Sequence, residues 1–270
     1  MKLDSLGIKD LTGIEDFESL TELYCRNNEL KNLDLSKNKF LEVLYCDNNQ
    51  LTTLDITNNT SLIKLYCYNN QLTTLDITNN TSLLRLWCWR NQLKNLDVSN
   101  NKPLEDLRCW SNQLASLDVG NNTWLETLFC DFNQLTSLDV SKNKHLQYLD
   151  CNDNQLKSLD VSNNISLRQF IINDNQLTNI DVSKHTYLTT LHCGGNQLTS
   201  LNVLNNASLV RLKCSNNQLT SLDVSNNKVL GNLWCYENQL TCIKINESQL
   251  NNDVSNWTKD DTSTWSLECD

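Results

Sequence analysis

Cysteine offers the most chemistry in this chain, because thiolates bind metals, attack electrophiles and form disulfides. The sequence has 12 cysteines in 270 residues. Ten of them follow a spacing of 21 residues, and Ile172 stands at the one place where the series lapses. A series this regular indicates a repeating structure rather than one catalytic or metal site. Its members are Cys25, Cys46, Cys67, Cys88, Cys109, Cys130, Cys151, Cys193, Cys214 and Cys235.

Each cysteine of the series lies between apolar positions, which predicts that it points inward and packs as a small hydrophobe. Thiols stacked in register about 4.8 Å apart do not give the near-perpendicular torsion of a disulfide. A straight column also does not converge on one point, so we expect reduced thiols, no metal and no cofactor. Cys242 and Cys269 stand outside the series, and we expect a disulfide between them that fixes the C-terminal segment and implies an oxidising compartment.

Aspartate forms a second series at the same spacing, interrupted by Asn202. Bound calcium requires six or more converging oxygens, and one carboxylate per repeat supplies too few. We therefore expect a solvated acidic face screened by water, backbone N–H groups and lysines, and leave open whether it binds cations. The series comprises Asp34, Asp55, Asp76, Asp97, Asp118, Asp139, Asp160, Asp181 and Asp223.

Candidates for catalysis are few. The chain has three histidines, His145, His185 and His192, and no pattern pairs them with a nucleophile. Asp131 and Asp150 lie one repeat apart beside aromatic residues, and such a carboxylate pair is what a glycosidase needs. Nothing in the sequence indicates that either carboxyl is buried enough to stay protonated. We therefore expect a solvated rim and a protein that is not an enzyme.

The unit that positions these residues reads L-x-x-L-x-C-x-x-N-x-L-x-x-L-D-V-S-x-N-x-x, as in residues 125–145. Apolar residues alternate in L-x-C and in L-D-V, which is the period of a strand with one buried face. We predict a mainly-β solenoid of 11 coils with short parallel strands on both sides of each coil. The expected divisions are an N-terminal cap or partial repeat at 1–19, the solenoid at 20–245 and a C-terminal cap at 246–270.

Asparagine fills the ninth position of every unit, from Asn28 to Asn238, and a second series runs from Asn38 to Asn227 with His185 as its one departure. An asparagine ladder can satisfy buried backbone groups at a bend, each amide donating to one coil and accepting from the next. Asparagine also tolerates a left-handed backbone, so it can replace glycine, of which the chain has only six. We expect both ladders to be structural.

This repeat resembles leucine-rich repeats, and its nested form is similar to the bacterial subclass called IRREKO repeats. The stretch Asp10-Leu-Thr-Gly-Ile-Glu-Asp-Phe17 resembles the internalin-type turn that leads into such arrays. Asn256-Trp-Thr258 and Trp265-Ser-Leu-Glu-Cys269 are similar to end modules of bacterial cell-surface repeat proteins. Relatives are mostly adhesion and recognition proteins. The resemblance therefore implies a secreted or cell-surface protein, whose signal and anchor are not visible in this sequence.

Charge and hydropathy limit the classes of partner that we expect for this protein. A net charge of -10 argues against nucleic acid. No apolar run approaches the roughly 20 residues of a membrane-spanning helix, so we expect no transmembrane segment.

The positions just before and just after each cysteine vary between repeats and face outward, so they are the positions that can determine what the protein binds. In the second to sixth units they are enriched in aromatic residues, although aromatics make up only 7% of the chain. Tryptophan, tyrosine and arginine together are typical of protein interfaces, so we expect a non-catalytic module that binds a protein partner. The expected binding residues are Tyr45, Tyr66, Tyr68, Arg85, Trp87, Trp89, Arg90, Arg108, Trp110, Phe129, Asp131 and Phe132.

Three other interpretations stay open. The same platform can stack on sugar rings, so a polysaccharide is the alternative ligand. A second copy of the chain can meet the aromatic face in a homodimer. Finally, β propensity alone favours aromatic ladders in strands.

Overall fold

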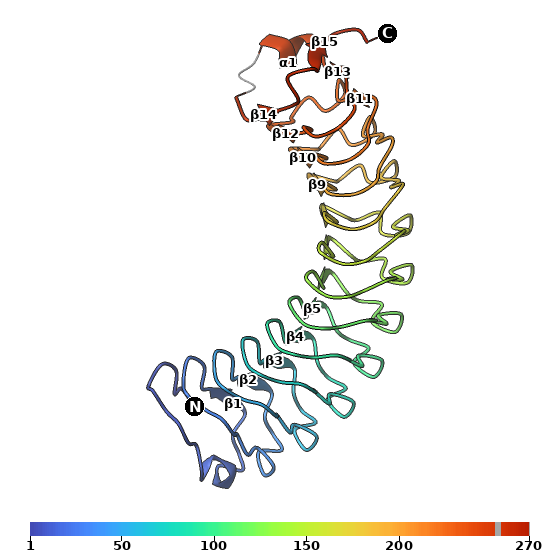
Figure 1. Ribbon diagram of the computed structural model, residues 1–270. Coiled ribbons are helices and arrows are strands. Elements are labelled where there is room, and N and C mark those ends of the chain that lie inside the picture. Colours follow the sequence, from blue (N-terminus) through green and yellow to red (C-terminus); the bar gives the residue numbers. More distant parts are fainter. Residues whose placement is uncertain (252–254, 270) are drawn as a thin grey trace. The chain divides into compact units, whose positions relative to one another are not determined.

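The computed structural model describes residues 1–251 and 255–269. Its contacts divide the chain into two compact units, Met1–Leu135 and Thr136–Asp270. Each unit is a stack of coils in which one short strand of a coil pairs with the equivalent strand of the next (Figure 1). The predicted parallel, mainly-β solenoid with almost no helix is confirmed.

Unit 1 carries one parallel strand in each coil, preceded by the short 3-10 helix η1 (Ile14–Asp16). The register advances 21 residues per strand, so that Leu44 pairs with Leu65 and Leu65 with Leu86. Equivalent residues therefore form straight rows across the sheet. The strands are β1 (Glu22–Tyr24), β2 (Val43–Tyr45), β3 (Lys64–Tyr66), β4 (Arg85–Trp87), β5 (Asp106–Arg108) and β6 (Thr127–Phe129).

Unit 2 repeats this arrangement and adds a second small sheet near the C-terminus. Its main sheet has the order β7 (Tyr148–Asp150), β8 (Gln169–Ile171), β9 (Thr190–His192), β10 (Arg211–Lys213), β12 (Asn232–Trp234) and β14 (Trp257–Thr258). The second sheet consists of β11 (Leu222–Asp223), β13 (Cys242–Lys244) and β15 (Thr264–Ser266). The single α-helix among the described residues is α1 (Glu247–Asn251).

The core of each coil is built from leucine and cysteine, as the alternation predicts. Leu44 and Cys46 are fully buried on either side of the outward Tyr45, and the same alternation recurs along the stack. All ten cysteines of the series are free and buried. Burial raises the pKa of the Cys25 thiol to about 12, so these thiols stay protonated and unreactive.

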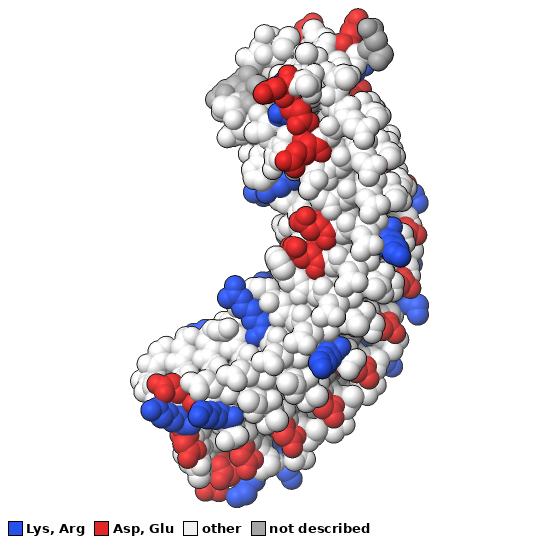
Figure 2. Space-filling view, in the orientation of Figure 1, with Lys and Arg blue, Asp and Glu red and all other residues white. Residues whose placement is uncertain are grey.

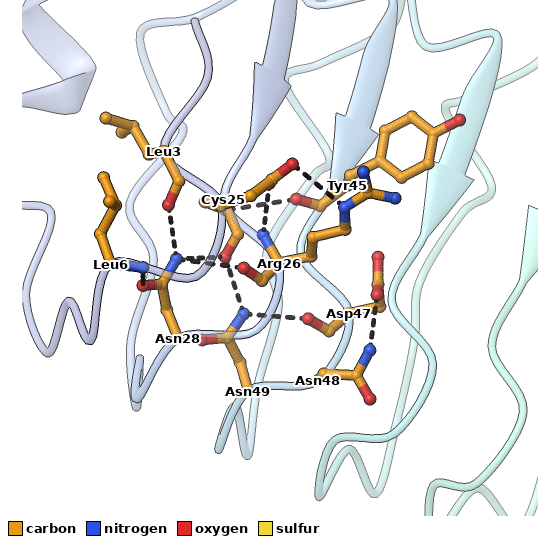
Figure 3. A network of polar contacts seen from close by, with 10 residues as sticks. Leu3, Leu6, Cys25, Arg26, Asn28, Tyr45, Asp47, Asn48 and Asn49 are labelled. Atoms are coloured by element: carbon orange, nitrogen blue, oxygen red, sulfur yellow. Dashed lines mark hydrogen bonds and ion pairs between the residues drawn. The ribbon is translucent and has the colours of Figure 1, made fainter.

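The first asparagine ladder closes the turn after each strand (Figure 3). Asn49 Nδ2 donates to Cys25 O of the preceding coil at 3.0 Å and to Cys46 O of its own coil at 3.1 Å, while its Oδ1 accepts from Leu30 N. The expected coil-to-coil bridging is thus present. The left-handed residue, however, is the one before the ladder asparagine, such as Asn48 with φ 53°, so its assignment to the ladder asparagine was wrong. The side chain of the ladder asparagine forms hydrogen bonds to the backbone instead.

The second ladder is buried at the opposite bend. Asn59 Nδ2 donates to Leu35 O and Asn38 O of the preceding coil. His185 fills the one exceptional position, where its Nε2 lies 3.1 Å from Val161 O. Gln249 of α1 takes the next position, with Nε2 donating to Val224 O and Asn227 O. The ladder geometry therefore continues beyond the last repeat.

The aspartate series is exposed, and each carboxylate closes a turn within its own coil. Asp76 Oδ1 accepts from Thr78 N at 3.0 Å and from the Thr78 hydroxyl at 2.7 Å. These hydrogen bonds lower the pKa of Asp76. In the described chain, this side forms regular strands only at β11, β13 and β15, rather than in every coil as predicted.

Both terminal segments extend the stack they adjoin. Leu3 N and Ser5 N donate to Tyr24 O and Arg26 O, so the N-terminal residues run alongside the first coil. In unit 2, β14 pairs with β12 and β15 pairs with β13. A disulfide joins Cys242 to Cys269, with the Cα atoms 5.8 Å apart. The exposed end of the core is thereby covered by the C-terminal segment.

Candidate interaction face

The candidate site is the outward face of the unit 1 sheet. Two rows of side chains run across it, one at the residue before each cysteine and one at the residue after. We call these the preceding row and the following row, and both together the aromatic face. The preceding row is Tyr24, Tyr45, Tyr66, Trp87, Arg108 and Phe129, and the following row is Arg26, Asp47, Tyr68, Trp89, Trp110 and Asp131.

Rings of the preceding row stack on one another from coil to coil. The Tyr24 and Tyr45 centroids lie 5.0 Å apart, Tyr45 and Tyr66 4.2 Å apart, and Tyr66 meets Trp87 edge-on at 4.6 Å. Tyr66 is only 3% exposed because rings cover it from both sides, so its predicted availability to a partner was wrong. It supports the stack instead. Burial also raises its pKa to about 12.

Rings of the following row form a second stack in which the ring planes are nearly parallel. Tyr68 and Trp89 lie 4.0 Å apart, Trp89 and Trp110 lie 4.4 Å apart, and both pairs have an interplanar angle of 9°. Both faces of Trp89 are therefore occupied by neighbouring rings. What the half-buried rings of this row show to solvent is chiefly their edges, together with the indole N–H groups of Trp89 and Trp110.

Arginines complete the stacks. The Arg108 guanidinium lies 4.3 Å from the Trp87 ring centroid and 5.1 Å from that of Phe129. The Arg90 guanidinium lies 5.5 and 5.1 Å from the centroids of Trp89 and Trp110. Arg90 and Phe132 occupy the left-handed turn position rather than either row, and Phe132 is 52% exposed. The exposed Arg85 begins β4.

The carboxylates of this face are withdrawn from solvent. Asp106 Oδ1 accepts from Arg108 Nε and its Oδ2 accepts from Trp87 Nε1, each at 3.0 Å. Asp47 is fully buried, and its Oδ2 accepts from Asn48 Nδ2 at 2.8 Å; burial raises its pKa. Asp131 is 9% exposed, so the expectation of a solvated rim there was wrong. Rings and arginines that extend over these short side chains account for their burial.

Unit 2 builds the same strands with polar residues. Burial raises the pKa of Asp150 to about 6, which contradicts the expectation that this carboxyl is simply solvated. Burial lowers the pKa of His192 to about 4, so its imidazole is neutral at pH 7. Among the described residues, no group of three or more histidine, cysteine, aspartate or glutamate side chains is arranged to hold a metal ion. No described helix has the length and apolarity to cross a membrane.

Comparison with solved structures finds bacterial leucine-rich repeat proteins. The functional domain of internalin J of Listeria monocytogenes, described as including a cysteine ladder, is 34% identical with a TM-score of 0.78. The alignment covers 97% of this chain but spans only 60% of that domain. Internalin F of the same species is 23% identical, with a TM-score of 0.81 and coverage of 96% and 85%.

YopM of Yersinia enterocolitica is 28% identical with a TM-score of 0.67, covering 87% of this chain and 55% of that one. No family model matches the chain, and no curated protein does. These neighbours agree with the internalin-like resemblance seen in the sequence.

Proposed function

Starting from the fact that this chain is a leucine-rich repeat solenoid of internalin-like character, we propose that it is a non-catalytic recognition or adhesion module that binds a protein through the aromatic face of unit 1. Leucine-rich repeat proteins such as the internalins and YopM act in protein–protein interaction. In this proposal residues 20–245 are the recognition solenoid, and 1–19 and 246–270 are its caps.

The observation that carries the proposal is the pair of ring stacks on one sheet face. Tryptophan, tyrosine and arginine dominate the energetics of protein interfaces because they bury much surface with few rotatable bonds. Here the rings are already held by neighbours at 4.0–5.0 Å, so little side-chain entropy remains to be lost on binding. In unit 2 the same strand positions carry Asp150, His192 and Lys213 instead, so strand propensity alone does not explain the rings.

The polysaccharide alternative loses its main support in this geometry. Stacking on a sugar requires an open ring face, and both faces of Trp89 are covered by Tyr68 and Trp110. The ring edges and arginines that remain suit the mixed polar and apolar surface of a protein.

An extracellular location fits the covalent structure. The disulfide between Cys242 and Cys269 is stable in an oxidising compartment. The ten remaining cysteines are buried, and burial raises the pKa of thiols such as Cys25 and Cys235, so oxidation does not reach them readily. The internalin-like character of the neighbours supports the same location.

The test is a pull-down from the native environment with wild type and with a variant carrying Trp87→Ala, Trp89→Ala and Trp110→Ala. We expect the wild type to retain a specific protein that the triple variant loses. Trp124→Ala is the matched control, because Trp124 is 60% exposed and lies outside the strands. Circular dichroism must show that the triple variant keeps the wild-type spectrum. Equal retention by both proteins would refute the proposed face.

Two further measurements test the other interpretations, a homodimer and a polysaccharide ligand. Sedimentation of the wild-type chain over a range of concentrations detects a homodimer, and the triple variant would be monomeric if the aromatic face forms it. Calorimetry against purified oligosaccharides tests the glycan reading directly. If the wild type binds an oligosaccharide and the triple variant does not, the ligand of this face is a polysaccharide rather than a protein.

A further inference from the structure

Exposed positive charge lies beside the aromatic face on a protein whose net charge is -10. Figure 2 shows basic side chains gathered next to β4 and β5. Arg85 and Arg90 are both exposed, and neither forms an ion pair with any carboxylate in the described part of the chain. Both guanidinium groups therefore keep donors available to a partner.

The negative charge of the same face is not similarly available. Asp47 is fully buried and Asp131 nearly so. Asp106 is held by two hydrogen bonds from Arg108 and one from the Trp87 indole. The aspartates next to the ring stacks are therefore withdrawn from solvent, while Arg85 and Arg90 lie exposed beside the stacks.

The ring stacks act in the same direction. The edge of an aromatic ring is the positive part of its quadrupole, and stacking turns the edges of Trp89 outward. In the described residues, no acceptor lies within hydrogen-bonding distance of the indole N–H of Trp89 or Trp110. Neither N–H is among the buried atoms that lack a partner, so both are accessible to solvent. Carboxylate oxygens would find donors and positive edges together here.

We infer that the partner bound by this face is an acidic polypeptide segment, whose carboxylates pair with Arg85 and Arg90 while its apolar side chains pack against the Trp89 and Trp110 edges. This inference rests on the proposed function and specifies its partner. Arg90 is the central residue, because its guanidinium is positioned over two indoles and leaves its N–H edge free. A polypeptide is favoured over a sulfated polysaccharide because the covered ring faces do not stack on sugars.

The experiment measures fluorescence anisotropy of the full chain with a labelled Glu-Leu repeat peptide, its Gln-Leu counterpart and labelled heparin. We expect the Glu-Leu peptide to bind, the Gln-Leu peptide to bind at least about tenfold more weakly, and added salt to weaken the interaction. The variant Arg85→Glu with Arg90→Glu should lower the affinity for the Glu-Leu peptide by at least about tenfold.

The matched control reverses two exposed lysines of the same unit, Lys94→Glu and Lys102→Glu, and changes the net charge equally. It should leave binding within about twofold, because these lysines lie outside the aromatic face. Equal loss in both double variants would reduce the effect to overall charge and overturn the inference. Equal binding of the glutamine peptide, no binding of the glutamate peptide, or binding of heparin alone would also overturn it.

Failure of this inference and failure of the proposed function give different results. If the native partner is lost by the tryptophan triple variant but retained by Arg85→Glu with Arg90→Glu, the face binds protein and the acidic partner is wrong. If neither variant loses the partner, the aromatic face itself is wrong.

Discussion

The asparagine ladder gives the sharpest prediction of stability, because its partners are known atom by atom. Asn91 Oδ1 accepts from Leu72 N at 3.0 Å, and its Nδ2 donates to Cys67 O at 3.1 Å and Cys88 O at 3.0 Å. In Asn91→Ala, Leu72 N loses its acceptor in a buried position. The two carbonyls each keep one donor, since Asn70 also reaches Cys67 O and Asn112 reaches Cys88 O.

These losses set the magnitude. A buried N–H without an acceptor costs about 1–3 kcal/mol, and each lost hydrogen bond to a carbonyl costs about 1 kcal/mol. We therefore expect Asn91→Ala to lower the free energy of unfolding by about 3–5 kcal/mol. Asn95→Ala is the control on the same coil, because Asn95 is exposed, and it should change stability by less than about 0.5 kcal/mol.

Urea unfolding followed by circular dichroism measures the change in free energy, and hydrogen exchange locates it. The Leu72 amide and its neighbours in the adjoining coils should lose protection first, because each repeat is stabilised by its nearest neighbours. An Asn91→Ala protein as stable as the Asn95→Ala control would refute the reasoning that the ladder satisfies buried backbone groups.

Four other predictions concern protonation and covalent structure. Burial raises the folded-state pKa of Asp150 to about 6, above its unfolded value, so stability should fall as pH rises from about 4 to 6; melting curves of Asp150→Asn should lack this step, and an unchanged slope would contradict it. Hydrogen bonds from the Thr78 hydroxyl and N–H lower the pKa of Asp76. Carbon NMR should therefore give this carboxyl a pKa below 3.8, and Thr78→Ala should raise that pKa. Native protein should show no thiol reactive to Ellman's reagent, and rapid labelling of the ten buried thiols would refute their assignment to the core. Removing the Cys242–Cys269 bridge should lower the free energy of unfolding by about 3.5 kcal/mol, as expected for a sequence separation of 27.

The period of 21 residues was enough to predict the solenoid, because each repeated position has one environment. Cys46 and Leu44 alternate with Tyr45, and this alternation alone predicts which of them is buried. The left-handed turn was harder to place. Its position holds asparagine in some coils but Arg90, Ser111 or Phe132 in others, so residue type does not reveal the positive φ there. The turn geometry that repeats from coil to coil comes from the ladder asparagine that follows this position.

The second side of each coil forms fewer strands than its alternation predicts. L-D-V alternates like a strand, and Asp76 and its equivalents use their carboxylates to accept from the N–H two residues later. Asp223 accepts from Ser225 N in the same way, yet it belongs to β11, where Val224 N donates to Lys244 O of the next coil. The local hydrogen bond is therefore compatible with a strand, and the alternation alone does not predict in which coils the second sheet forms.

The aromatic face shows the same limit at the level of function. Alternation predicts that Tyr68, Trp89 and Trp110 point outward, but not which part of each ring meets solvent. That depends on the spacing of neighbouring strands: rings repeated in register stack, so their faces are satisfied by one another and their edges remain. The same crowding covers Asp47 while Arg90, with its longer side chain, reaches across the rings to solvent. The two rows thus present ring edges, with Arg85 and Arg90 exposed beside them, and this arrangement favours an acidic protein segment over a sugar.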